Sequence, residues 1–120
     1  MNVTRSGWFP LFALVLLVLL LSGACGDEEN RFLISIQLSP TSASIDDVAP
    51  NNTVQFIATG FFSKGPNADL TNTATWSSSQ TAVATVNSSG LVTAVPGACD
   101  STVIRAVQNN IVATATVSVC

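Results

Sequence analysis

The side chains able to do chemistry are three cysteines and a few carboxylates. The 120 residues include seven Asp and Glu, four Lys and Arg, and no histidine. Without imidazole there is no Ser-His-Asp triad, no Cys-His dyad and no histidine metal ligand. The run Ser77–Ser79 therefore has no base to activate a nucleophile, and the carboxylates lack the Asp-x-Asp-x-Asp spacing of a calcium loop. We predict that the protein is not an enzyme and uses no cofactor and no metal.

Positive charge is scarce and scattered along the chain. After Cys25 the basic residues are Arg31, Lys64 and Arg105. Three separated cations do not form the basic stripe that binds phosphate backbones, so nucleic acid is not an expected partner.

The first residues have the pattern of an export signal. Arg5 precedes the apolar run Leu11–Leu21, which is shorter than the roughly 20 residues that span a bilayer and typical of a signal-peptide core. The segment Leu21–Cys25 resembles a lipobox, where bacterial lipoprotein precursors are acylated on cysteine and cleaved just before it. The resemblance predicts cleavage after Ala24 and a lipid on Cys25. An ordinary secretory signal and an uncleaved membrane anchor are the alternatives.

These features divide the chain into three parts. Residues 1–24 are the predicted signal peptide, and residues 25–31 are the lipidated cysteine with an acidic linker. Residues 32–120 are the predicted domain. The membrane is then a partner through the lipid, and the protein belongs in the cell envelope. Because Gly26 rather than aspartate follows the cysteine, analogy with lipoprotein sorting favours the outer membrane in a bacterium that has two.

From Phe32 onward, apolar and polar residues alternate between turn signals, which is the pattern of β-strands. About seven short strands in a chain of this length predict an all-β fold, an antiparallel β-sandwich. The expected strands are residues 34–38, 54–59, 74–76, 83–86, 91–95, 102–107 and 111–119.

The last two expected strands form a hairpin that can be checked for register. A two-residue loop at Asn109–Asn110 pairs Gln108 with Ile111, and the same register places Cys99 opposite Cys120. Such a position is a non-hydrogen-bonded pair with Cα atoms about 4.5 Å apart, which suits a disulfide. A lipid on the first cysteine also leaves an even number in an exported protein. We predict this disulfide; two free thiols, or Cys120 bonded to another chain, are the alternatives.

Four segments of the predicted domain resemble the bacterial immunoglobulin-like domain, group 2 (the Big family). The resemblance implies an immunoglobulin-like sandwich on a bacterial surface that acts as a spacer or binding module and has no catalytic residues. The sequence departs from the family pattern at Gly97–Ser101. The matching segments are Leu38–Ser44, Thr53–Gly60, Ala74–Ser79 and Val83–Ala94.

The resemblance also assigns individual side chains to the core or the surface. Trp76 is expected in the core with a partner for its indole N–H. Of the neighbours Phe61 and Phe62, one must point outward from a strand, and Phe61 is the candidate contact residue. The other expected core residues are Phe56, Ile36, Val86 and Ile104.

The sequence therefore predicts an exported envelope lipoprotein with a single immunoglobulin-like domain. Its expected role is non-catalytic: adhesion, binding or structural support, with a protein or glycan ligand that the sequence does not define. The alternative is an accessory subunit of a larger envelope or surface complex.

Overall fold

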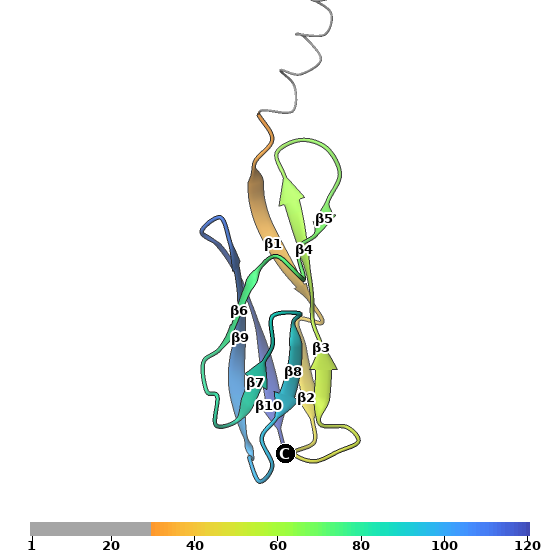
Figure 1. Ribbon diagram of the computed structural model, residues 1–120, viewed down its shortest axis with the longest axis vertical. Helices are drawn as coiled ribbons and strands as arrows, with labels where there is room; N and C mark the ends of the chain where they lie inside the picture. Colours follow the sequence, from red (N-terminus) through yellow and green to blue (C-terminus); the bar gives the residue numbers. More distant parts are fainter. Residues whose placement is uncertain (1–29) are drawn as a thin grey trace, which may run out of the picture. The chain divides into compact units, whose positions relative to one another are not determined.

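Ten strands make up the part of the chain that the computed structural model describes, residues 30–120 (Figure 1). The predicted signal peptide, Cys25 and most of the linker lie outside these residues. Within residues 30–120 no helix is long and apolar enough to cross a bilayer. In chain order the strands are β1 (Leu33–Ser39), β2 (Ser42–Ile45), β3 (Thr53–Gln55), β4 (Ile57–Phe62), β5 (Ala68–Asp69), β6 (Thr75–Ser78), β7 (Ala84–Val86), β8 (Leu91–Ala94), β9 (Asp100–Gln108) and β10 (Ile111–Val119).

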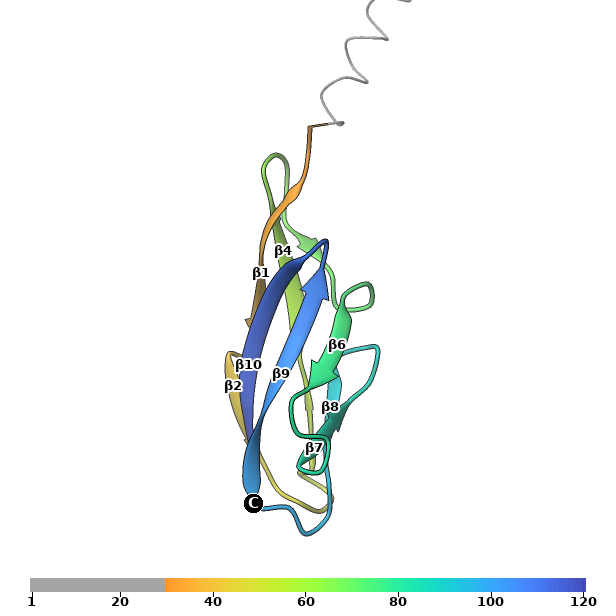
Figure 2. The ribbon, with the colours of Figure 1, turned by 90° about the vertical axis from the view of Figure 1, so that its left-hand side faces the viewer.

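The strands form a sandwich within the compact unit Phe32–Cys120. One sheet has the order β2-β10-β9-β6, and the two others have the orders β1-β4-β5 and β3-β8-β7. The four-stranded sheet forms one layer and the two smaller sheets form the other (Figures 1 and 2). The predicted all-β sandwich is confirmed. One pair differs from the prediction, because β2 runs parallel to β10.

The parallel pair arises where β1 ends. Pro40 follows Ser39, the last residue of β1, and proline has no N–H to continue a ladder. Beyond it the chain leaves β4 and continues as β2 beside β10. One stretch of chain thus contributes to both layers, which the alternation of residues did not predict.

The expected strand 54–59 is also divided between two sheets. Phe56 separates β3, which pairs with β8, from β4, which pairs with β1. Its side chain is fully buried, and its amide donates to the carbonyl of Gly90 at 3.0 Å. The structure therefore has more strands than the predicted seven, since this strand is interrupted and β2 and β5 are too short for a clear alternation.

A β-bulge changes the outward face of β1. Leu33 pairs with Phe62, but the next pair is Ser35 with Phe61, so β1 has one extra residue at this point. Leu33 is buried and Ile34 is exposed. The alternation that placed Ile34 on the same face as the inward residues of β1 is therefore wrong at this position.

The core lies between the two layers. Phe56 and Ile104 are fully buried, as predicted. Trp76, Ile36 and Val86 are only partly buried, and they pack against the edge of the core. The other large side chains at the centre are aliphatic, and they include Leu38, Val92, Val117 and Val119.

The final hairpin has the predicted register. Gln108 pairs with Ile111 across Asn109 and Asn110, whose φ angles of 51° and 65° are those of a type I′ turn. The inward residues of both strands are buried and most of their neighbours are exposed. Nine residues on each strand give this hairpin a length of about 30 Å.

Candidate binding surfaces

The predicted disulfide joins the ends of β9 and β10. Cys99 and Cys120 are bonded, with their Cα atoms 4.4 Å apart. The amide of Cys120 also donates to the carbonyl of Ile45 at 3.1 Å. The end of β10 is thus held to β9 by a covalent bond and to β2 by backbone pairing.

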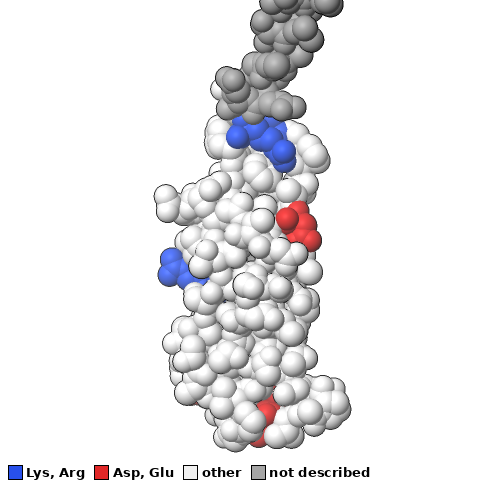
Figure 3. Space-filling view, viewed as in Figure 1, with Lys and Arg blue, Asp and Glu red and all other residues white. Residues whose placement is uncertain are grey.

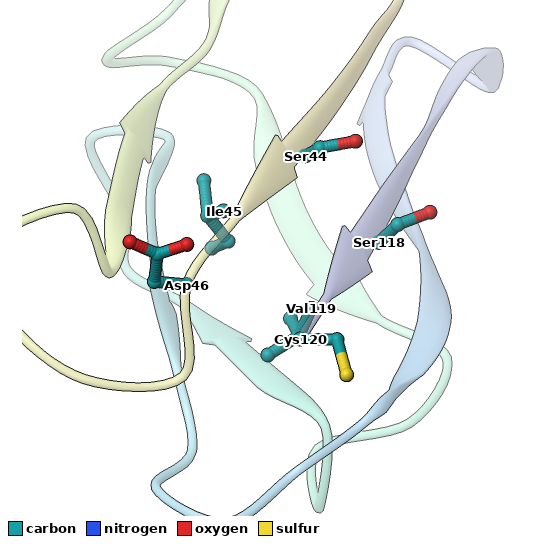
Figure 4. Close-up of a pocket in the computed structure, with 6 residues that line it drawn as sticks. All are labelled: Ser44, Ile45, Asp46, Ser118, Val119 and Cys120. Atoms are coloured by element: carbon teal, nitrogen blue, oxygen red, sulfur yellow. The ribbon is translucent and has the colours of Figure 1, made fainter.

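A small hollow lies beside this bond (Figure 4). Its volume is about 210 Å³, below the roughly 300–1,000 Å³ of pockets that hold drug-sized ligands. The hydroxyls of Ser44 and Ser118 point to one side, whereas the carboxylate of Asp46 points to the other (Figure 4). Because these polar groups do not converge, the hollow has no arrangement that would orient a small molecule. Its lining residues are Ser44, Ile45, Asp46, Ser118, Val119 and Cys120.

The serine run at the end of β6 has a structural role. The hydroxyl of Thr102 is buried and lies 2.8 Å from the hydroxyl of Ser78 and 3.2 Å from that of Ser79. It also accepts the amide of Gln80 at 3.0 Å. These bonds hold the chain after β6 against β9. Thr102 was not singled out from the sequence, because its neighbours in space lie more than 20 residues away.

Asp69 organises a second buried hydroxyl. Thr71 donates its amide and its hydroxyl to Oδ1 of Asp69, at 2.9 Å and 2.5 Å. The same hydroxyl accepts the amide of Ala58 at 3.0 Å. The hydrogen bond from the Thr71 side chain, followed by that from its backbone, holds the pKa of Asp69 below its ordinary value of 3.8.

This arrangement predicts an acid dependence of stability. A carboxyl whose folded pKa is lowered stabilises the fold above its unfolded pKa, and that contribution is lost as pH falls through the folded pKa. Asp69→Asn is therefore expected to lower the urea midpoint at pH 7 and to differ less from the parent at about pH 3. Urea unfolding of both proteins at the two pH values is the measurement. An equal gap between the midpoints at both values would contradict the role of the charge.

Two other aspartates hold loop segments in place by hydrogen bonds. Asp47 accepts the amide of Gly97 at 3.0 Å, across 50 residues of chain. Asp46 accepts the side-chain amide of Asn51 at 3.3 Å. Within residues 30–120 no group of three potential metal ligands is close together.

Trp76 supports the core rather than offering a stacking surface. Its indole N–H donates to the carbonyl of Thr71 at 2.8 Å, which supplies the partner expected from the sequence. Its strand position faces Ala106 on the inner side of the sheet. The ring also lies against Gly90, where an added Cβ would approach Trp76 Cζ2 to 2.8 Å.

The outer side of the four-stranded sheet forms a surface that we call the hydroxyl face. Ser118 on β10 has Ser44 of β2 on one side and Ser101 of β9 on the other. Strand neighbours are about 4.8 Å apart and alternate residues about 6.7 Å apart. The hydroxyls share this side of the sheet with the exposed side chains of Val103, Arg105 and Val112. Figure 3 shows a different side of the sandwich, in the view of Figure 1, and that side is largely uncharged with isolated acidic and basic side chains. The residues of the hydroxyl face are Ser42, Ser44, Ser101, Thr114, Thr116 and Ser118, and all are exposed.

Phe61 lies near the end of β4 and is partly exposed. It pairs with Ser35, which is exposed on the outer side of β1. Phe62, by contrast, packs against the core. The role of Phe61 as a contact stays a prediction.

Comparison with known proteins shows what this sandwich is similar to. The chain is 34% identical over 131 residues to Ice-binding protein 1 of Shewanella frigidimarina (strain NCIMB 400). It also resembles domains 5–6 of the S-layer protein SbsC, with a TM-score of 0.60 and 24% identity over 76% of this chain and 45% of that chain. No protein-family model matches the sequence, and membership of the Big family stays a prediction.

The two alignments cover different shares of the proteins that they compare. The alignment with the ice-binding protein covers 99% of this chain, so it includes the N-terminal segment as well as the sandwich. The chain spans only 14% of the length of that relative. The S-layer likeness establishes the all-β fold, and the names of both proteins are those of non-catalytic proteins.

Proposed function

We propose that this chain is an exported lipoprotein whose group 2 bacterial immunoglobulin-like sandwich is a non-catalytic spacer and binding module in the cell envelope. The observation that carries the proposal is the position of the two ends of the sandwich. β1 begins at one end, and β10 finishes at the opposite end (Figure 1). A lipid at Cys25 would therefore hold the first end near the membrane and direct the disulfide-bonded end away from it.

The comparisons support this proposal in two ways. The likeness to the ice-binding protein extends through the predicted signal and linker, so the segment proposed to export and anchor the chain has a counterpart in a longer protein. In both similar proteins the matching region is only part of the chain, 14% in one and 45% in the other. A domain that occurs as one part of longer chains is consistent with the proposed role as a spacer and binding module.

The lipid is tested by metabolic labelling in bacterial cells. The full chain is expected to incorporate labelled palmitate and to remain with the membranes, whereas Cys25→Ala is expected to lose the label. The double variant with Cys99→Ser and Cys120→Ser is the matched control, because it removes two cysteines and keeps the lipobox. Equal labelling of Cys25→Ala and the parent would exclude a lipid on this residue.

The alternative role is that of an accessory subunit in a larger envelope complex. Affinity purification from intact cells separates the two roles. A stoichiometric envelope partner supports the subunit, and binding to external matrix or glycan supports an independent binding module.

One observation favours a second function. The hydroxyl face presents exposed serine and threonine side chains on three neighbouring strands, and the named relative is an ice-binding protein. Direct binding to ice, or to another hydroxyl-rich surface such as a glycan, would use Thr114 and Thr116. Inhibition of ice growth by the full chain, lost when both threonines are replaced by lysine, would support this function; unchanged ice growth would leave the spacer role.

A further inference from the structure

We propose that the end of the sandwich nearest the lipid docks directly into the interface of the membrane. This inference rests on the proposed lipid at Cys25. The surface concerned, which we call the membrane tip, consists of Phe32, Ile34, Phe61 and Lys64. Its proposed partner is the bilayer itself, between the headgroups and the first part of the acyl chains.

The membrane tip has the most exposed large apolar side chains in the described residues. Phe32 is 64% exposed and Ile34 is 54% exposed. Phe61 lies on the same outer side, since it pairs with the exposed Ser35. The β-bulge turns Ile34 outward although a regular alternation would place it inward. The sandwich does not cover the side chains of Phe32 and Ile34, so an apolar environment outside the protein would supply burial that the fold does not.

The membrane tip is held in place by the sheet. The amide of Phe32 donates to the hydroxyl of Ser63 at 3.1 Å, and the amide of Ser63 donates to the carbonyl of Phe32 at 2.9 Å. These bonds continue the pairing of β1 with β4 to the end of the sandwich. Lys64 follows directly and is exposed. A lysine beside aromatic side chains suits the membrane interface, because its chain lies along apolar surface while its ammonium reaches the headgroups.

The short linker would keep the membrane tip close to the bilayer. Six residues, Gly26–Arg31, separate Cys25 from Phe32, and they extend at most roughly 20 Å. The linker contains Asp27, Glu28 and Glu29, whose repulsion from anionic headgroups offsets the attraction of Arg31 and Lys64. Docking must therefore depend on apolar insertion more than on charge, and it is expected to be similar on zwitterionic and anionic vesicles.

The test uses the mature lipoprotein, purified and reconstituted into vesicles of phosphatidylethanolamine and phosphatidylglycerol. Phe32→Trp and Val48→Trp are a matched pair, since both positions are exposed, at 64% and 53%. Val48 lies in the connection between β2 and β3, at the end of the sandwich opposite to β1's start (Figure 1). The fluorescence of Trp76 contributes the same background to both variants. Lipids brominated near the headgroup are expected to quench the tryptophan at 32 and to leave that at 48 unchanged.

A second change tests the apolar contact itself. In the Phe32→Trp protein, Ile34→Asp is expected to lower the ratio of docked to undocked molecules by about tenfold or more, because an aliphatic side chain no longer enters the interface. Val48→Asp in the same protein is the control and is expected to leave the quenching unchanged.

The failure of docking and the failure of the lipid give different results. Without the lipid, palmitate does not label the protein and the protein does not stay with the vesicles. If the palmitate-labelled protein stays with the vesicles but tryptophan at 32 is quenched no more than tryptophan at 48, the docking proposal is wrong and the proposed lipid on Cys25 is retained. A blue-shifted Phe32→Trp spectrum in detergent, together with a dimer by sedimentation, would overturn docking in favour of a second copy as the partner.

Discussion

Replacing both Cys99 and Cys120 with serine is expected to lower the free energy of unfolding by about 3 kcal/mol. The bond closes a loop between residues 21 apart in sequence, and its loss gives the unfolded chain the entropy of an open loop. For a domain of this size, the change corresponds to a fall in melting temperature of roughly 12–24 °C.

Thermal unfolding followed by circular dichroism, with and without a reducing agent, measures the effect. Reduction is expected to destabilise the parent protein and to leave the double variant unchanged. Ser101→Ala is the control, because it removes only an exposed hydroxyl contact with Ser118 at 3.2 Å beside the bond. A double variant that melts with the parent would show that the bond adds no stability.

Gly90→Ala is expected to destabilise the sandwich by about 3 kcal/mol. Gly90 has a φ of +77°, where a side chain is unfavourable. An added Cβ would lie 2.8 Å from the backbone oxygen of Phe56 and 2.8 Å from Trp76 Cζ2. The turn has little freedom to move, because the side chain of Asn87 accepts the amides of Ser89 and Leu91.

Gly97→Ala separates the backbone cost from the steric cost. Gly97 has a similar φ of +85°, but an added Cβ would meet nothing within 4 Å. The Gly97→Ala variant is therefore expected to lose only about 1 kcal/mol of its free energy of unfolding. Urea unfolding of the two variants gives the comparison, and Trp76 fluorescence reports any displacement of the ring beside residue 90. Equal destabilisation of both variants would contradict a close contact at Gly90.

The last hairpin was predictable because its information is local. Asn109 and Asn110 favour a tight turn, and the side chains on either side then alternate in a fixed register. That register alone placed Cys99 opposite Cys120. The burial of Phe56 and Ile104 also followed from sequence, because each lies at an alternate position with other apolar residues on one side of its expected strand.

Other features depend on segments that are distant in the chain. Pro40 indicated an end to a strand, but the parallel pairing of β2 with β10 depends on β10 being available beside it. The sequence predicts Phe56 in the middle of one strand. Only the hydrogen bond from its amide to the carbonyl of Gly90 shows why it separates two strands, β3 and β4. The buried hydroxyls of Thr71 and Thr102 find their partners across loops in the same way.

By itself the sequence determined the all-β class, the final register with its disulfide, and the scarcity of groups able to catalyse. These properties follow from composition, from alternation within strands and from one tight turn between neighbouring strands, which need no knowledge of the rest of the chain. Only the tertiary structure decided which sheet each strand joins, that the bulge turns Ile34 outward beside Phe32, and that the sandwich's two ends point apart. Those properties depend on pairings between segments far apart in sequence. The hydrogen-bond partners of such segments are set by which strands lie beside them in the folded protein.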